Sequence, residues 1–496
     1  MRRISFLLYV FILGILFCSA TSAETPEQEA FTAGNYQYVL LPDETAEIRK
    51  YTGAAEALTI PSDLNGVKVT SIGKSAFYKC LSFTSVIIPD SVISIGDSAF
   101  DRCHNLISVT IPDSVTSIED NAFYACNRLS SITIPDSVIF IGKNPFCNCE
   151  SLSSIIVSPD HPVLATISNV LFRKSDKSLI CYPMAKNNFE YKIPQGISVI
   201  GDSAFSNCSR LTAVTIPGSV TSIEDSAFSG CSNLTKITIP NSVTSIEDYT
   251  FRFCSSLTEI TLPDSITSIG DYAFDGCKKI ISITIPDSIT SIGDYAFTGC
   301  SNLTEVTIPD GVTSIGDSAF ADCSNLSKVI IPNTIISIEK STFKSCSSLN
   351  EIILPDSITS IGDYAFAFCS SLAEIIIPDN VLSIGDSAFT FCSSLTKIVI
   401  PDSITSIEDS VFNSCFSLTE ISIPESVTSI GDSAFNSCSE LKKVTIPENV
   451  IFIEKNAFNN CKKLTLTVPR NSYPAQYCKD NQLNYLYTDS HDWLNQ

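Results

Sequence analysis

Histidine is scarce in this chain of 496 residues, which contains only His104, His161 and His491. General acid–base catalysis and zinc coordination both rely heavily on histidine, so few positions are available for either chemistry. His161 and Cys181 flank one irregular segment and suggest a thiol with a nearby base, but no third group to orient them is apparent. The sequence also has no phosphate-binding loop, zinc cluster or nucleotide-binding fingerprint. These absences predict a non-enzymatic protein with no catalytic residues, no metal and no cofactor.

Positive charge is also in short supply, because 31 lysines and arginines face 53 aspartates and glutamates, giving a net charge of −22. Such an acidic surface repels nucleic acids and anionic lipids. DNA and RNA are therefore excluded as partners.

Long apolar runs are absent except at the start, where Arg2 and Arg3 precede an apolar stretch over residues 4–17 and a small-residue site at 21–23. This pattern predicts a signal peptide over residues 1–23 and an exported protein without a transmembrane segment after cleavage. An uncleaved anchor is the alternative, although about fourteen apolar residues are few for a bilayer. Lipidation at Cys18 is a third possibility, but the residues just before Cys18 lack the small side chain expected before a lipoprotein cysteine.

Cysteine is abundant, with 20 residues, yet its placement does not indicate a disulfide framework. Sixteen cysteines stand at one repeat position, three residues after a phenylalanine, as in Phe77 and Cys80. A column of like residues behaves as a set of small buried hydrophobes and offers no obvious pairing. The exceptions are Cys18, Cys147, Cys181 and Cys478, and a bridge from Cys478 to Cys461 stays open.

Proline marks a strict period of 23 residues from Pro194 to Pro447. In the unit "LTKITIPNSVTSIEDYTFRFC", Leu234, Ile237 and Ile239 have the spacing of a leucine-rich repeat strand and point inwards. The proline ends the strand, a second short extended run follows, and Asp248 is placed to cap a single helical turn. No such unit can bury its apolar face alone, which explains why it is repeated.

The predicted fold is therefore an α/β repeat solenoid. It is a right-handed leucine-rich repeat stack of 23-residue units, mostly β with short helical turns, with its parallel β-sheet on the concave face. Sixteen units at about 4.8 Å per strand would extend roughly 80 Å.

The organisation along the chain follows from this period. We expect an N-terminal cap and first coil over 24–72, repeats over 73–150 and 194–468, and a C-terminal cap over 469–496 with a helix at 473–482 and a strand at 485–487. The segment 151–193 interrupts the period and predicts a hairpin, with strands at 170–172 and 179–182. It is either a tolerated insertion or a bend or ligand loop.

The motif "L-x-x-I-x-I-P-x-S-V-x-S-I-G-x-x-A-F-x-x-C" resembles that of the BspA-like leucine-rich repeat family, also called Treponema-pallidum-type repeats. The N-terminal "YQYVLLPDETAEI" and the interrupting "NVLF…LICYP…YKIPQGISVIGDSAF" are also similar to pieces of that family. The resemblance covers essentially the whole chain after residue 23. It implies a secreted or surface protein, often an adhesin for matrix proteins, cells or receptors, with no catalytic motif.

Acidic residues also form columns, such as Asp202, Asp225, Asp248, Asp271, Asp294 and Asp317. Stacked carboxylates are one way to hold calcium. Turn caps explain this column more simply, and a second column at Asp264, Asp287 and Asp310 is explained by turn residues.

The informative positions are those that the core does not dictate. The first outward strand position often carries opposite charges in neighbouring coils, as in Glu305, Lys328 and Glu351 and again in Glu374, Lys397 and Glu420, which indicates either a solvated ladder or cross-strand pairs. The second outward position is usually threonine, but four consecutive coils carry Ile330, Ile353, Ile376 and Val399. Good strand propensity is one explanation. An exposed apolar stripe rimmed by charge is the other, and it predicts a protein-binding site.

The function predicted from these residues and from the resemblance is that of a secreted or cell-surface protein that binds other proteins. Its partners would be host matrix proteins, receptors or neighbouring cells, and the chain would act as a monomeric adhesin. The alternatives are a surface-coat protein that assembles laterally and a glycan-binding surface protein. A glycan-binding protein should carry aromatic platforms on its concave face, and the outward strand positions show almost none.

Overall fold

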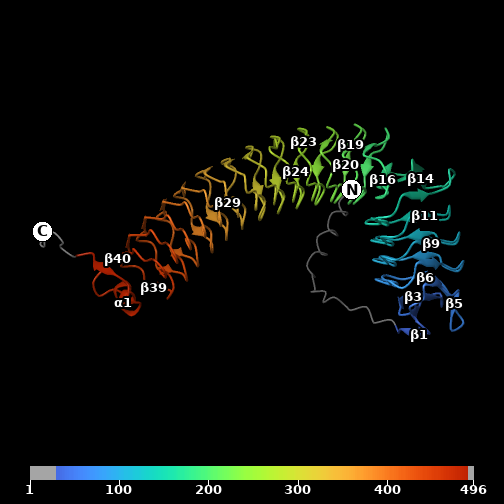
Figure 1. The fold of residues 1–496 in the computed structure, drawn as a ribbon, viewed down its shortest axis with the longest axis horizontal. Coiled ribbons are helices and arrows are strands. Elements are labelled where there is room, and N and C mark those ends of the chain that lie inside the picture. The colour runs from blue at the N-terminus through green and yellow to red at the C-terminus, as the bar shows by residue number, and fades with distance from the viewer. Residues whose placement is uncertain (1–28, 490–496) are drawn as a thin grey trace, which may run out of the picture.

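The computed structural model describes residues 29–489, which wind into a curved stack of coils (Figure 1). The predicted signal peptide, Cys18 and His491 lie outside these residues. Each regular coil contributes a short strand to a second column. Every regular coil except the one over residues 280–302 also contributes a longer strand to a first column, built from the leucine-rich repeat spacing. Strands of one column pair in parallel with a shift of one repeat, so that Lys236 lies opposite Glu259 and Ile237 opposite Ile260. The predicted repeat solenoid with parallel sheets is confirmed.

The first column consists of β4 (Ala57–Thr59), β7 (Ser85–Ile87), β9 (Ser108–Thr110), β11 (Ser131–Thr133), β13 (Ser154–Ile156), β17 (Glu190–Lys192), β19 (Ala213–Thr215), β21 (Lys236–Thr238), β23 (Glu259–Thr261), β26 (Glu305–Thr307), β28 (Lys328–Ile330), β30 (Glu351–Ile353), β32 (Glu374–Ile376), β34 (Lys397–Val399), β36 (Glu420–Ser422), β38 (Lys443–Thr445), β40 (Thr465–Val468) and β41 (Tyr485–Tyr487).

The second column consists of β6 (Val67–Ile72), β8 (Ser94–Ile95), β10 (Ser117–Ile118), β12 (Phe140–Ile141), β16 (Ser178–Cys181), β18 (Val199–Ile200), β20 (Ser222–Ile223), β22 (Ser245–Ile246), β24 (Ser268–Ile269), β25 (Ser291–Ile292), β27 (Ser314–Ile315), β29 (Ser337–Ile338), β31 (Ser360–Ile361), β33 (Ser383–Ile384), β35 (Ser406–Ile407), β37 (Ser429–Ile430) and β39 (Phe452–Ile453).

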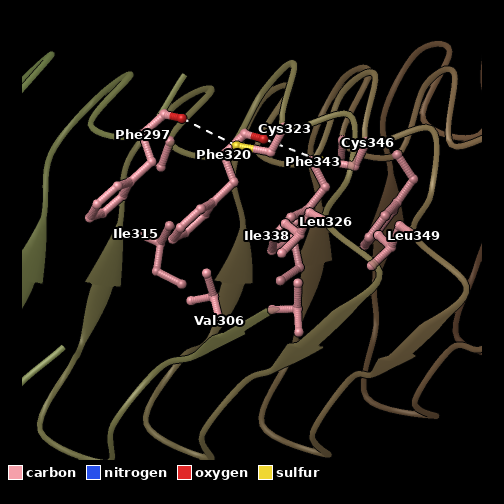
Figure 2. Packing of buried hydrophobic residues seen from close by; sticks show 14 of the residues in the cluster. Phe297, Val306, Ile315, Phe320, Cys323, Leu326, Ile338, Phe343, Cys346 and Leu349 are labelled. Atoms are coloured by element: carbon pink, nitrogen blue, oxygen red, sulfur yellow. Dashed lines mark hydrogen bonds between the residues drawn. The ribbon is translucent and has the colours of Figure 1, made fainter. Parts of the chain in front are cut away.

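The core is a set of columns of like side chains between the two strand columns and the turns (Figure 2). Phe297, Phe320 and Phe343 lie parallel, with ring centroids 5.2 and 5.8 Å apart, and each is fully buried. Within each array, every coil therefore covers the apolar surface of the coil before it, which gives the array a continuous interior.

Separate elements cover the two ends of the stack. At the start, β1 (Phe31–Ala33), β2 (Tyr36–Leu40) and β3 (Ala46–Tyr51) form an antiparallel meander whose last strand pairs in parallel with β6. The short strand β5 (Asp63–Leu64) pairs back on β6 through a turn at Asn65 and Gly66, both with positive φ. At the other end, α1 (Tyr473–Asp480) follows an N-cap at Ser472, and β41 pairs with β40.

The irregular segment forms a meander that divides the core. Strands β14 (Leu164–Ile167), β15 (Val170–Arg173) and β16 are antiparallel, and β16 continues in parallel into β18. Leu171 and Ile180 pack into the N-terminal core cluster, whereas Phe172 and Leu179 pack into the C-terminal one. The β15–β16 pair is thus a wall shared by two arrays, and Figure 1 shows that the stack changes direction there.

The curvature of the stack places the first column on its outer side, where β19 and β23 lie in Figure 1. Aromatic rings at the same position in successive coils show how far apart the coils are at that position. The Tyr249, Tyr272 and Tyr295 rings on the turns are 4.9 and 4.6 Å apart, against 5.5 and 5.2 Å for the core phenylalanines of the same three coils. The sequence led us to expect the sheet on the concave side. Instead, the inner surface is formed by turn segments such as residues 248–254, which we call the turn face.

Hydrogen bonds between coils follow the same gradient. The Gly270 amide donates to Ile246 in the second column at 2.7 Å, while the Thr258 amide donates to Thr235 beside the first column at 3.0 Å. The turns are tight because residues such as Tyr249 adopt positive φ, and among the described residues the only α-helix is α1. The expected helical turns are therefore hydrogen-bonded turns.

Candidate protein-binding surface

The four predicted apolar contact residues form one continuous line on the outer face of the first column. Ile330 lies opposite Ile353 in the sheet, and Ile376 lies opposite Val399. Their exposed fractions are 48%, 73%, 83% and 59% in chain order. Because strands alternate their side chains, the same strands bury Val329, Ile352, Ile375 and Ile398 in the core. We call the four exposed residues the isoleucine stripe, which extends roughly 15 Å at ordinary strand spacing.

The same outward position carries isoleucine in two places that the sequence reasoning overlooked. Ile87 is 50% exposed and Ile156 is 48% exposed, both in the N-terminal array. Thr110 and Thr133 occupy this position in the two coils between them. These isoleucines are therefore isolated, and scattered single apolar residues are ordinary on protein surfaces. The isoleucine stripe differs because its members are consecutive.

The charged position beside the stripe forms ion pairs in some coils and none in others, so both readings of the charge ladder apply. Lys328 bonds Glu351 at 2.7 Å, and Lys236 bonds Glu259 at the same distance. The hydrogen bond to Glu351 raises the pKa of Lys328. Within the described chain, the exposed residues Glu374 and Lys397 form no ion pair within 4 Å. Exposed pairs contribute little stability, so these charges remain available to a partner.

A shallow hollow of about 350 Å³ begins where the isoleucine stripe ends. Val399, Ser422 and Thr445 form its floor, since their side chains are shorter than isoleucine, and Lys397, Glu420 and Lys443 line its edge. The stripe is therefore an apolar ridge that runs into a polar depression.

The column of aspartates connects successive coils. The Asp271 carboxylate accepts a hydrogen bond from the Asp294 amide of the next coil at 2.7 Å, and Asp248 accepts from Asp271 in the same way. The caps expected within each turn are thus bonds between neighbouring turns. Among residues 29–489, no group of three or more histidines, cysteines and acidic residues is arranged to hold a metal ion.

The remaining candidates for chemistry are occupied by structural contacts. The His161 Nε2 lies 3.1 Å from the Pro135 carbonyl oxygen, and its Nδ1 accepts from the amides of Val163 and Leu164. Cys181 is buried in the N-terminal core, where burial raises the pKa of its thiol. All cysteines in the described part of the chain are free thiols, including Cys147, Cys461 and Cys478.

The bend between the arrays holds a hollow of about 640 Å³ on the turn face. Its polar groups largely satisfy one another. Asn148 donates to Tyr124 at 2.6 Å, Asn127 donates to Glu150 at 3.0 Å, and Asn207 donates to Asn148 across the bend. The first two bonds lie within the N-terminal array, and the Asn207–Asn148 bond joins the two arrays at the bend.

A family model described as "BspA type Leucine rich repeat region (6 copies)" matches the chain over residues 70–192, 181–292, 267–382 and 359–478. The chain belongs to the BspA-type leucine-rich repeat family. This is a family of bacterial surface-type leucine-rich repeat proteins, and membership supports a role in protein interaction. Among the helices of the part that the structure describes, none is long and apolar enough to cross a membrane.

Several solved structures of bacterial leucine-rich repeat proteins are similar to this BspA-type protein. One from Bacteroides ovatus is 30% identical, with 88% of this chain and 99% of that chain covered and a TM-score of 0.48. A leucine-rich cell surface protein from Faecalibacterium prausnitzii is 28% identical, with coverage of 96% and 98% and a TM-score of 0.38. The leucine-rich repeat protein of T. pallidum is 26% identical, with coverage of 51% and 91% and a TM-score of 0.24. No curated protein matches the chain.

Proposed function

We propose that this protein is a secreted or surface-held adhesin that binds a host extracellular-matrix protein or cell receptor through the isoleucine stripe. The observation that carries the proposal is the run of four consecutive exposed apolar residues at an outward position that elsewhere carries mostly threonine and only isolated isoleucines. Contiguous apolar surface with a charged rim is typical of the centre of a protein interface.

The energetics of the stripe fit this role. Fully burying one isoleucine side chain is worth about 1.5–3 kcal/mol, so burying Ile353 and Ile376 would supply a substantial part of a micromolar affinity. The exposed charges at Glu374 and Lys397 would then set the register of the partner. A standard interface needs about 800 Å² on each side, which the broad face of the first column around the stripe can supply.

The test is a double substitution, Ile353→Thr with Ile376→Thr, in the chain spanning residues 24–496. Threonine already occupies this position at Thr261 and Thr307, so the fold should tolerate it. Ile156→Thr is the matched control, because it makes the same change at the same repeat position in the other array. Binding would be measured by surface plasmon resonance against immobilised fibronectin, fibrinogen, laminin and collagen.

We expect the double variant to bind at least about tenfold more weakly and the Ile156→Thr control to bind as the unaltered chain does. Unchanged binding by the double variant would overturn the role of the stripe. Sedimentation of the unaltered chain as a monomer is expected; large assemblies would instead favour a surface coat. Fractionation of the producing cells should place the chain outside the cytoplasm.

A further inference from the structure

Three tyrosines form a stacked ladder on the turn face. Tyr249, Tyr272 and Tyr295 occupy the same position in successive coils, and their ring planes are within 7° of parallel. The Arg252 guanidinium lies beside the first two rings, 5.4 Å from the Tyr249 ring centre and 5.2 Å from that of Tyr272. Asp275 holds this arginine at 2.9 Å. The first two rings of the ladder are therefore already in contact with the protein's own side chain.

The other end of the ladder opens into a gap. Ser318 and Ser341 replace tyrosine in the next two coils, and tyrosine returns at Tyr364 in the third. A hollow of about 400 Å³ fills this interval, with Tyr295 and Tyr364 among its lining residues and the two buried serines at its floor. Three coil spacings of about 4.8 Å separate the two tyrosines, which leaves roughly 10 Å between the rings.

The remaining wall of the hollow carries hydrogen-bonding groups of both signs. Asp317, Asp322, Lys340 and Lys344 line it, and in the described part of the chain none of their side chains forms a salt bridge. The Lys344 ammonium lies 5.5 Å from the ring centre of Tyr364. Two acidic and two basic groups leave the hollow with no net formal charge, so it favours neither a cation nor an anion.

We propose that this hollow, which we call the tyrosine gap, binds a neutral oligosaccharide, with one sugar ring against Tyr295 and another against Tyr364. A pyranose presents apolar C–H faces that pack on aromatic rings and hydroxyl edges that both donate and accept hydrogen bonds. Aspartate carboxylates accept from these hydroxyls, and the lysine ammoniums donate to them. Small-ligand sites usually combine apolar walls with a few polar groups that converge on the ligand.

The tyrosine gap is independent of the isoleucine stripe. It lies on the inner turn face, whereas the stripe lies on the outer first column, and the two share no residue. It also supplies the aromatic platforms that a glycan-binding protein requires, at turn positions instead of on the strands.

The decisive variant is Ser318→Tyr, which fills the gap with a tyrosine at the repeat position that the ladder tyrosines occupy. Ser318 has φ 56°, the same value as Tyr295, so the backbone of Ser318→Tyr is already suited to tyrosine. Ser387→Tyr is the matched control. Ser387 also has φ 56° and occupies the same repeat position, but it lies in the coil after Tyr364, outside the gap.

Binding would be measured by isothermal titration with maltohexaose, cellohexaose, xylohexaose, laminarihexaose, mannohexaose and chitohexaose as probes. We expect at least one probe to bind the unaltered chain. Ser318→Tyr and Tyr364→Ala should each weaken that binding at least about tenfold, while Ser387→Tyr should not change it. The melting midpoint of each variant, followed by circular dichroism, verifies its fold.

Three results would overturn the proposal. One is the failure of every probe to bind the unaltered chain at millimolar concentration. Another is full binding by Ser318→Tyr, and the third is equal loss in Ser318→Tyr and Ser387→Tyr at unchanged melting midpoints. Because none of these variants alters the isoleucine stripe, each outcome is distinct from failure of the proposed adhesin role.

Discussion

The thiol of Cys323 donates a hydrogen bond to the carbonyl oxygen of Phe297, 26 residues earlier, with a sulfur–oxygen distance of 3.2 Å (Figure 2). Cys346 makes the same bond to Phe320, also at 3.2 Å. The repeated cysteine is thus a small buried side chain that also satisfies a backbone carbonyl of the preceding coil. This double use explains why a cysteine column persists without disulfides.

The first prediction concerns this bond. Cys323→Ala should destabilise the protein by about 1–2 kcal/mol, since it removes a buried hydrogen bond and leaves a small cavity. Urea unfolding followed by circular dichroism measures the change. Cys461→Ala is the control, because Cys461 makes the same bond at the half-buried end of the column and should cost less. An equal loss at both sites would contradict the importance of burial.

Stability should fall at alkaline pH. Burial raises the pKa of the cysteine thiols, to about 11 for both Cys461 and Cys478 and further for interior members such as Cys323. A raised folded-state pKa means that the unfolded chain loses thiol protons first. Stability is therefore complete below the ordinary value of 9.0 and declines as pH rises through the folded-state values. Melting midpoints should be level from pH 6 to 8 and should decrease above about pH 9; a level profile to pH 11 would contradict this.

Glycine stands beside the accepting carboxylate in most bonds of the aspartate column, although Glu408 takes that place where the Asp409 amide donates to Asp386 at 3.3 Å. A Cβ added at Gly293 would lie 2.5 Å from Oδ1 of Asp271, which accepts from the Asp294 amide. Gly293→Ala should therefore destabilise the protein by about 1–3 kcal/mol, as measured by urea unfolding. Gly218→Ala is the control, because its Cβ would meet nothing within 4 Å. Combining Gly293→Ala with Asp271→Ala should cost less than the sum of the two single changes, since the contact with Oδ1 is removed, while the contacts with the backbone N of Asp271 and C of Gly270, both at 2.7 Å, remain.

The shared wall should couple the two arrays. Leu171 is fully buried in the N-terminal core cluster on a strand whose other face belongs to the C-terminal cluster. Leu171→Ala should cost about 2–5 kcal/mol, and hydrogen exchange should increase in coils on both sides of the meander. Ile167→Ala, on the neighbouring exposed position of β14, should have little effect. Exchange confined to one side would show that the arrays unfold independently.

The loss of binding caused by a substitution in the isoleucine stripe should increase with the exposed area of the residue that is replaced. Ile376 is 83% exposed and Ile330 is 48% exposed, so a partner covering the stripe removes more apolar surface from water at Ile376. Ile376→Thr should therefore weaken binding to the matrix protein identified by surface plasmon resonance more than Ile330→Thr does. The reverse order would place the partner towards the beginning of the stripe.

Much of the architecture was predictable because the repeat constrains it. The inward positions of Leu234, Ile237 and Ile239 follow from strand alternation, and all three are buried as expected. The consecutive exposure of Ile330, Ile353, Ile376 and Val399 follows from the same alternation, because identical positions in successive coils must be neighbours. Their use in binding remains a prediction.

Other features could not be predicted from one coil. The aspartate carboxylates could be assigned to capping from the sequence, but not to the amide of the next coil, because the distance from Asp271 to Asp294 depends on how coils stack. The sequence left open whether the alternating charges form a solvated ladder or cross-strand pairs. The structure contains both, since Lys328 pairs with Glu351 while a flexible exposed lysine such as Lys397 gains little from one fixed partner.

The sequence by itself determined the repeat, the buried columns and which strand side chains point outwards, because a 23-residue period and strand alternation are local properties of the chain. Only the tertiary structure decided the direction of curvature. Small differences in coil spacing, 4.6 Å between turn tyrosines against 5.2 Å between core phenylalanines, accumulate over many coils and bend the stack towards its turns. That curvature places the tyrosine ladder and its gap on the inner surface and the isoleucine stripe on the outer one.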